Sequence, residues 1–162
     1  MSNAKGRSRA SGTVLLAVRL GKNTYGIPLA AVEVVLPALP IEVVPQCPEF
    51  LCGVVFVRGN LIPVVDCAER LGLKDHQRPL EPQIICLLVG DRVIGLQVDE
   101  ALDLVELESI EQLNLESMGM RPGFLSGIIN RNGEVIRLLN PEQLFAEKES
   151  LAIANIHGEC AT

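Results

Sequence analysis

The residues of this 162-residue chain that could carry out chemistry are five cysteines, two histidines and scattered carboxylates. Cys47, Cys52 and Cys67 with His76 offer the donor types of a zinc site, but their spacing matches no usual zinc-ligand pattern. The cysteines are odd in number, form no Cys-x-x-Cys pair and mostly lie beside apolar residues. We therefore expect reduced thiols that act as small hydrophobes, and no metal.

A thiol- or carboxylate-dependent hydrolase is the enzyme class that these residue types would allow, with Cys67 or Asp66 as the essential group. Asp66 ends an apolar run, as a catalytic aspartate can, but it lacks the tight turn of an aspartic protease, and its counterpart in the repeat described below is Asn140. Neither His76 nor His157 has a sequence context that pairs it with a thiolate. We expect Asp66 to cap a helix, and we expect no catalytic residue and no cofactor.

Composition argues against several other classes. No phosphate-binding loop of the GxxxxGK[ST] or GxGxxG type is present. The acidic stretch at 99–108 lacks the spacing of a calcium loop, so a solvated edge is expected. A formal charge of −6, 3% aromatic residues and no tryptophan disfavour nucleic acid as a partner. No apolar run approaches the roughly 18 residues of a membrane helix, and no signal peptide is recognisable, which predicts a cytoplasmic protein without direct membrane insertion.

The elements that must position these residues form an internal repeat. The stretch FLCGVVFVRGNLIPVVD (50–66) aligns without a gap with FLSGIINRNGEVIRLLN (124–140). A second pair, VRLGKNTYGIPL (18–29) and LLVGDRVIGLQV (87–98), aligns in the same order along the chain. Two matches in register indicate a duplication. We expect an all-β fold of two small SH3-like units that pack on each other, because neither would be very stable alone.

The first unit is expected at about 14–82 and the second at about 83–141. Each is predicted to run strand, hairpin, strand and capped helical turn. Asp66 fits the N-cap of the first helical turn, whereas in the second Asn140 caps and Pro141 takes the first helical position.

The remaining segments are less regular. Residues 1–12 are polar, small and basic, which predicts a disordered N-terminal tail. Residues 109–123 are expected to form a loop region, and 146–162 a C-terminal helix or tail.

Arg58-Gly59 lie between the apolar runs VVFV and LIPVV. We expect them to form a hairpin tip, with Gly59 supplying a positive φ. On composition alone, an arginine there only keeps the tip soluble. The counterpart of Arg58 in the repeat is Asn132, so the fold does not require an arginine at this tip.

These stretches resemble the CheW-like domain of bacterial chemotaxis coupling proteins. The most specific block is G-V-x-x-x-R-G-x-x-x-P-V-V-D, from Gly53 to Asp66, and the resemblance runs from about Val14 to Leu144. It implies one CheW-like domain over 13–145, built from two five-stranded SH3-like β-barrels around a shared apolar interface.

The resemblance also implies a non-enzymatic adaptor. Such adaptors bind the cytoplasmic tip of methyl-accepting chemoreceptors, the regulatory domain of the chemotaxis histidine kinase, and other CheW-like domains. The expected location is the cytoplasm, in association with membrane-bound chemoreceptor arrays.

Two surfaces are carried over from the resemblance. The receptor-binding groove between the barrels, an apolar trough that could take a receptor helix, maps onto Leu29, Val32, Val34, Leu61 and Leu104. The kinase- or partner-binding surface maps onto Gly53, Phe56, Val57, Arg58 and Gly59.

Two positions depart from the family pattern. Val34 stands where the family often has a glutamate that could pair with Arg58, and Glu33, one position earlier, is expected to face the other way. Phe56-Val57 replace the usual Asn-Leu before Arg-Gly. The sequence therefore leaves open an alternative, an assembly module that binds only the kinase or other CheW-like domains in a non-flagellar chemosensory pathway.

Overall fold

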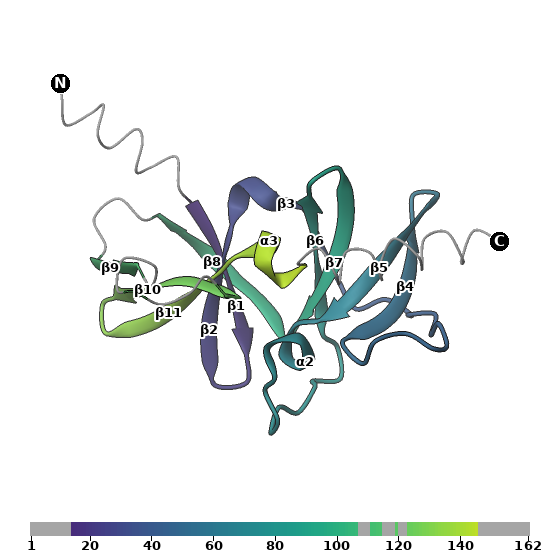
Figure 1. Cartoon of the computed structure of the whole chain (residues 1–162), viewed down its shortest axis with the longest axis horizontal. Helices are drawn as coiled ribbons and strands as arrows, with labels where there is room; N and C mark the ends of the chain where they lie inside the picture. The colour runs from purple at the N-terminus through teal and green to yellow at the C-terminus, as the bar shows by residue number, and fades with distance from the viewer. Residues whose placement is uncertain (1–13, 107–110, 115–118, 120–122, 146–162) are drawn as a thin grey trace.

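The computed structural model describes residues 14–106, 111–114, 119 and 123–145, and the described part is mostly β-structure (Figure 1). The first half of the chain forms β1 (Val14–Leu20), β2 (Asn23–Pro28), the 3-10 turn η1 (Leu29–Ala31), β3 (Val32–Leu36), β4 (Leu51–Val57), β5 (Asn60–Asp66) and α2 (Cys67–Leu71). The second half forms β6 (Gln83–Val89), β7 (Arg92–Val98), β8 (Glu100–Glu106), β9 (Glu111–Asn114), β10 (Leu125–Arg131), β11 (Glu134–Leu139) and α3 (Pro141–Leu144).

The described residues include no helix that is long and apolar enough to cross a membrane. The predictions of a disordered tail at 1–12 and of a helix or tail at 146–162 lie outside the described residues.

The duplication is visible in the strand registers. Position 124 corresponds to 50, a shift of 74, and the β10–β11 hairpin repeats the β4–β5 hairpin at that shift. Val57 pairs with Asn60 as Arg131 pairs with Glu134, and both hairpins have a register shift at the same place, after Leu51 and after Leu125. The repeat predicted from the sequence is therefore a structural repeat.

The strands do not group by halves of the chain. One sheet, here called sheet A, has the order β8-β1-β2-β11-β10-β9, and the other, sheet B, has the order β3-β6-β7-β5-β4. Each half thus lends its first hairpin to the sheet of the other half, through the parallel pairs β2–β11 and β5–β7. The predicted division into contiguous subdomains at 14–82 and 83–141 is wrong, because pairing between hairpins depends on contacts distant in sequence.

The prediction of two five-stranded units is otherwise confirmed. Sheet B has five strands, and sheet A has the five equivalent strands with β9 added at its edge. In the described residues the edge strands β3 and β4 are not hydrogen-bonded to each other, so the barrel of sheet B is open on that side. Figure 1 shows the β4–β5 and β10–β11 hairpins at opposite ends of the molecule, with the exchanged hairpins between them.

Three apolar clusters lie in the part of the chain that the structure describes. A large shared core joins the two sheets and includes Val18, Ile27, Leu87 and Leu96. A smaller cluster with Ile129 and Ile136 lies inside sheet A, and another with Val64 and Cys86 lies inside sheet B. This arrangement confirms the expected apolar interface between two small β-units.

Arg70 of α2 links the two repeats. Its guanidinium lies over the rings of Phe50 and Phe124, which are repeat-equivalent, at 5.0 and 4.4 Å from their centroids. Its Nε donates to the carbonyl oxygen of Leu144 in α3 at 2.9 Å. The charged hydrogen bond therefore joins the two helical turns, and the cation–π contacts join α2 to the residues that precede β4 and β10.

The predicted N-cap positions are confirmed in both halves, but only the first has a side-chain cap hydrogen bond. Asp66 accepts a hydrogen bond from the Glu69 backbone N–H at 3.2 Å, and Gly72 ends α2 in the left-handed region, with φ 78°. In α3, Pro141 is at the start as expected, but the side chain of Asn140 makes no cap hydrogen bond. Asn140 is the N-cap residue of α3 as predicted, although it caps without a side-chain hydrogen bond.

Two further expectations need correction. The segment 109–123, expected to be a loop region, contains the strand β9, which pairs with β10. Asp99, expected at a solvated edge, is buried and 6% exposed. The carboxylates that follow it in β8, on Glu100, Asp103 and Glu106, are exposed as expected.

Candidate partner-binding surfaces

The tip of the β4–β5 hairpin holds Arg58 in an unusual backbone conformation. Arg58 and Gly59 have φ values of 51° and 83°, and their counterparts Asn132 and Gly133 have 53° and 86°. Two consecutive positive φ values are those of a type I′ turn, in which Asn-Gly is strongly preferred. Asparagine tolerates the left-handed region, whereas arginine does not favour it. The first hairpin therefore carries a residue that its turn geometry disfavours.

The Arg58 side chain is exposed, and it forms no hydrogen bond or ion pair with any residue of 14–106, 111–114, 119 or 123–145. The family's usual glutamate position is occupied by Val34 in β3, at the opposite edge of sheet B from β4. A guanidinium left without a described partner at a projecting tip is available to another molecule.

Phe56 lies next to this tip and is 69% exposed. It pairs directly with Leu61 across the β4–β5 hairpin, and Leu61 is 39% exposed. Directly opposed residues of an antiparallel pair share a face, so the two side chains form one exposed apolar pair. We call Phe56, Arg58 and Leu61 the hairpin surface.

Two other residues predicted for this surface have different environments. Val57 is partly buried against the cluster inside sheet B. Gly59 is exposed, and a Cβ atom built there would meet nothing within 4 Å.

Gly53 has a structural role. It is buried with φ 145°, and a Cβ atom there would lie 2.0 Å from the carbonyl oxygen of Glu42. Glu42 and Val54 exchange backbone hydrogen bonds of 2.8 and 2.9 Å across this contact. Gly53 therefore lets the connector pack against β4 and offers no side chain to a partner.

The predicted receptor groove is only partly assembled. Leu29 and Val32 pack against the shared core. Leu104, 55% exposed on edge strand β8, pairs with Leu16, which belongs to the same core. These three residues lie on the core-facing side of the two sheets.

Val34 lies on the other face. A register shift between Val32 and Val34 places Val34 opposite Cys86, whose side chain lies in the cluster inside sheet B. Val35 instead pairs with Ile85 of the shared core. At the shift of 69 that relates 18 to 87, Val35 is the counterpart of Leu104, and both are exposed on edge strands.

The sequence reasoning therefore missed Val35. Extending the second repeat alignment beyond residue 29 would have found it, because VEVVL then falls on ALDLV at the same shift. We call Leu29, Val32, Val35 and Leu104 the edge-strand face.

Leu61 does not join the edge-strand face. Two strands, β6 and β7, separate β3 from β5 in sheet B. At about 4.8 Å per strand this places Leu61 roughly 14 Å from β3. Leu61 belongs to the hairpin surface through its pairing with Phe56.

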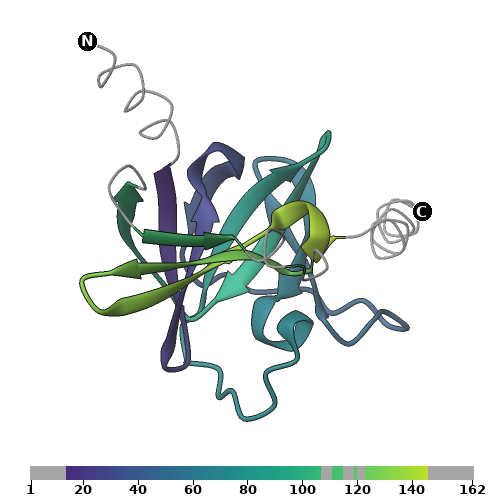
Figure 2. The same ribbon diagram turned by 60° about the vertical axis from the view of Figure 1, so that its left-hand side comes forward.

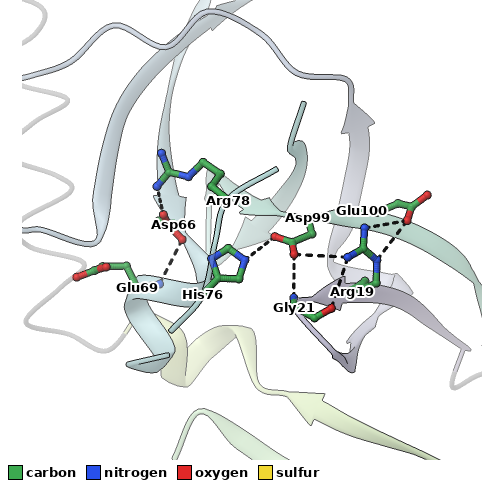
Figure 3. Close-up of polar contacts among 8 residues, drawn as sticks. All are labelled: Arg19, Gly21, Asp66, Glu69, His76, Arg78, Asp99 and Glu100. Carbon is green, nitrogen blue, oxygen red and sulfur yellow. Dashed lines mark hydrogen bonds and ion pairs between the residues drawn. The ribbon is translucent and has the colours of Figure 1, made fainter. Parts of the chain in front are cut away.

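Buried aspartates fasten the segment between α2 and β6, which loops beneath α2 (Figure 2). Asp99 accepts a hydrogen bond from the Gly21 backbone N–H at 2.8 Å, and its Oδ1 lies 2.6 Å from His76 Nε2. Arg78 forms an ion pair with Asp66, the N-cap of α2 (Figure 3). His76 and Arg78 thus hold this segment against the ends of β7 and β5.

The groups considered for catalysis are engaged or buried. Cys67 is fully buried, and desolvation together with the Asp66 and Asp99 charges raises the pKa of its thiol. Burial also raises the pKa of Cys52 to about 11, and its thiol donates to Gln97 Oε1 at 3.1 Å. A thiolate nucleophile needs a lowered pKa, so neither thiol has the required environment.

His76 faces Asp99 rather than a thiol. Within the described residues, no three side chains of His, Cys, Asp or Glu come together as metal ligands.

The chain resembles known proteins over most of its length. The CheW-like domain family matches residues 14–149. The probable chemotaxis protein CheW of Rhizobium etli is 31% identical over 140 residues, which cover 85% of this chain and 90% of that protein. The chemotaxis protein CheW of Rhizobium meliloti is 28% identical over 151 residues, which cover 92% and 97%.

The crystal structure of the scaffolding protein TtCheW from Thermoanaerobacter tengcongensis has the same fold. Its TM-score with this chain is 0.74 at 24% identity, and the match covers 85% of this chain and 95% of that one.

An exposed apolar pair and a cationic tip without a partner among the described residues, both on a β-sheet scaffold, are suited to binding other proteins rather than to transforming a substrate. The chain belongs to the CheW-like domain family and is a non-catalytic adaptor of bacterial chemotaxis.

Proposed function

We propose that the chain couples chemoreceptors to a chemotaxis-type histidine kinase within a signalling array. The hairpin surface contacts the kinase regulatory domain or another CheW-like domain, and the edge-strand face takes the apolar side of a receptor helix. Family membership supports the adaptor role. The hairpin assignment depends on Arg58. This residue adopts a turn conformation that favours asparagine, and its side chain has no partner among the described residues.

The receptor assignment is supported by the exposed aliphatic residues of the edge-strand face. Leu104 and Val35 are exposed on β8 and β3, while Leu29 and Val32 lie deeper against the shared core. An amphipathic helix recognises such a surface through apolar side chains one turn apart.

Binary binding assays with the cognate receptor fragment and the cognate kinase test the two surfaces separately. We expect Arg58→Asn to weaken kinase binding at least tenfold, and Leu104→Asp to weaken receptor binding at least tenfold. Each variant should leave the other partner's affinity within about twofold. Asn132→Arg is the matched control for the hairpin, because it alters the same turn position on the other sheet.

If wild-type protein binds neither partner while both are folded, the proposal fails. Binding to the kinase or to CheW-like domains without receptor binding would favour the assembly module. The exposed Phe56, which replaces the family's usual asparagine, is the feature that favours this second candidate.

A further inference from the structure

The segment between α2 and β6 covers a corner of the first repeat. This corner is formed by Arg19, Leu20 and Gly21 at the end of β1, together with Asp99 after β7. Leu73 packs against the shared core, and His76 contacts Asp99. The chain that follows the first helical turn thus folds back onto the end of β1 and onto Asp99, which come from different halves of the chain.

The second repeat has the same corner without a described cover. At the shift of 69, the counterparts are Leu88, Val89 and Gly90 at the end of β6, and Ala30 in η1. All four line a pocket of about 340 Å³, together with residues at the start of α3. No residue of the described ranges occupies the place that His76 takes in the first repeat.

The chemistry of the corner changes between the repeats. Arg19 and Asp99 form a charged pair in the first corner, and their counterparts Leu88 and Ala30 are apolar. Leu88 is 42% exposed although it lines the pocket. An aliphatic side chain would bury the apolar surface that Leu88 and Ala30 contribute to this pocket, which is also lined by Glu142.

We propose that the chain after α3 folds back as the segment after α2 does, and that Leu151 fills this pocket. At the shift of 74, the counterpart of His76 is position 150, directly before Leu151. The pocket is lined by Pro141 and Glu142 of α3 itself, and the six residue-to-residue steps from Phe145 to Leu151 can span about 20 Å. The chain from Phe145 is therefore long enough for Leu151 to reach the pocket, and the apolar Leu151 side chain suits the apolar residues that line it.

This docking supports a second part of the molecule. Ala30 and Ala31 of η1 line the pocket, and Leu29 of the same turn belongs to the edge-strand face. A side chain beneath η1 fixes the position of that turn. The proposal does not depend on which partners the edge-strand face binds.

Disulfide trapping tests the contact in a full-length chain in which Cys47 and Cys160 are replaced by serine. The pair Leu88→Cys/Leu151→Cys is expected to form an intramolecular disulfide under mild oxidation, identified by peptide mass mapping. The pair Val135→Cys/Leu151→Cys is the control, because Val135 is equally exposed, at 44% against 42%, but lies on β11 of sheet A. It should not cross-link.

Hydrogen exchange supplies a readout that does not depend on disulfide geometry. Ending the chain after Phe145, or replacing Leu151 with Asp, should speed amide exchange around Gly90 at least fivefold and leave exchange around Gly133 unchanged. Absence of both the cross-link and the exchange effect overturns the proposal. A cross-link that forms mainly between two chains also overturns it, because the occupant would then be a second copy.

Discussion

Arg58 occupies a left-handed turn position in which an arginine is less stable than an asparagine. Replacing it with the residue of the sister turn, Arg58→Asn, should raise the free energy of unfolding by about 1 kcal/mol, because asparagine tolerates the positive φ of 51°. Urea unfolding of the purified protein measures this change.

Asn132→Arg is the reciprocal control. It should lower the free energy of unfolding by a similar amount and leave kinase binding unchanged. A loss of stability in Arg58→Asn would contradict this account, since it would mean that the guanidinium supports the fold.

The cysteine thiols make stability depend on alkaline pH. Burial, together with the smaller effect of the nearby Asp66 charge and against the opposing effect of Arg78, raises the pKa of Cys52 from 9.0 to about 11. Because the folded state favours the neutral thiol, its stabilising contribution is complete below about pH 9 and is lost as pH rises towards 11. The free energy of unfolding should therefore fall over this range.

Cys52→Ser tests the assignment, because a hydroxyl can still donate to Gln97 but does not titrate here. The decline between pH 9 and 11 should be shallower in this variant. Burial also raises the pKa of Cys67, so part of the fall in the free energy of unfolding should remain in this variant. An unchanged slope would show that Cys52 does not contribute.

At the residue scale, the sequence could predict the hairpin tip. It could also predict that the fold does not require an arginine there. It could not decide whether Phe56 is exposed, because an aromatic residue in a strand fits a core or a surface equally well. The prediction placed Val34 rather than Val35 in the receptor groove, because it assumed that side chains alternate regularly along the strand. The register shift between Val32 and Val34 reverses that alternation.

At the scale of elements, Gly53 determines how the proline-rich connector meets β4. Gly53→Ala should lower the free energy of unfolding by about 3 kcal/mol, because the new Cβ atom would lie 2.0 Å from the Glu42 oxygen in a strained backbone conformation. Thermal unfolding followed by far-UV circular dichroism measures the effect.

Gly123→Ala is the control for this substitution. A Cβ atom at Gly123 meets nothing within 4 Å, so the change should stay within about 0.5 kcal/mol. If Gly53→Ala is equally mild but weakens kinase binding, the glycine belongs to the partner surface as the family resemblance implied.

Local elements were the most predictable part of the fold. Hairpins, turn glycines and the Asp66 cap follow from short sequence patterns whose partners lie within a few residues. The strand β9 was missed because its pairing with β10 is set by the sheet rather than by its own four residues.

At the scale of the whole molecule, the exchange of hairpins makes the two halves interdependent. A fragment 1–82 lacks β8 and β11 beside β1 and β2, and it lacks β6 and β7 between β3 and β5. We expect fragments 1–82 and 83–162 to be unfolded separately and to recover native-like circular dichroism when mixed. A cooperative unfolding transition in either fragment alone would contradict this.

The exchange of hairpins between the two sheets could not be predicted from the sequence repeat. The same two aligned sequences are compatible with two self-contained barrels or with two interlocked ones, since each hairpin presents the same edge to either sheet. The large shared core, which includes Leu16, Ile27, Leu87 and Leu96, forms in the interlocked arrangement. The choice depends on pairing between strands distant in sequence, 112 residues apart for Thr24 with Ile136 and 31 for Val64 with Gly95, rather than on local patterns.

Hairpin exchange also describes how two copies of a single half would assemble, since a lone half could complete its sheet only with a hairpin from another chain. This chain has the strand order of such a two-fold dimer, with both halves in one polypeptide. Two identical copies must present identical ends, whereas joined copies can diverge. Arginine at one tip and asparagine at the other then give a near-symmetric body one cationic tip and one neutral tip, so a partner that requires the guanidinium can bind at only one of them.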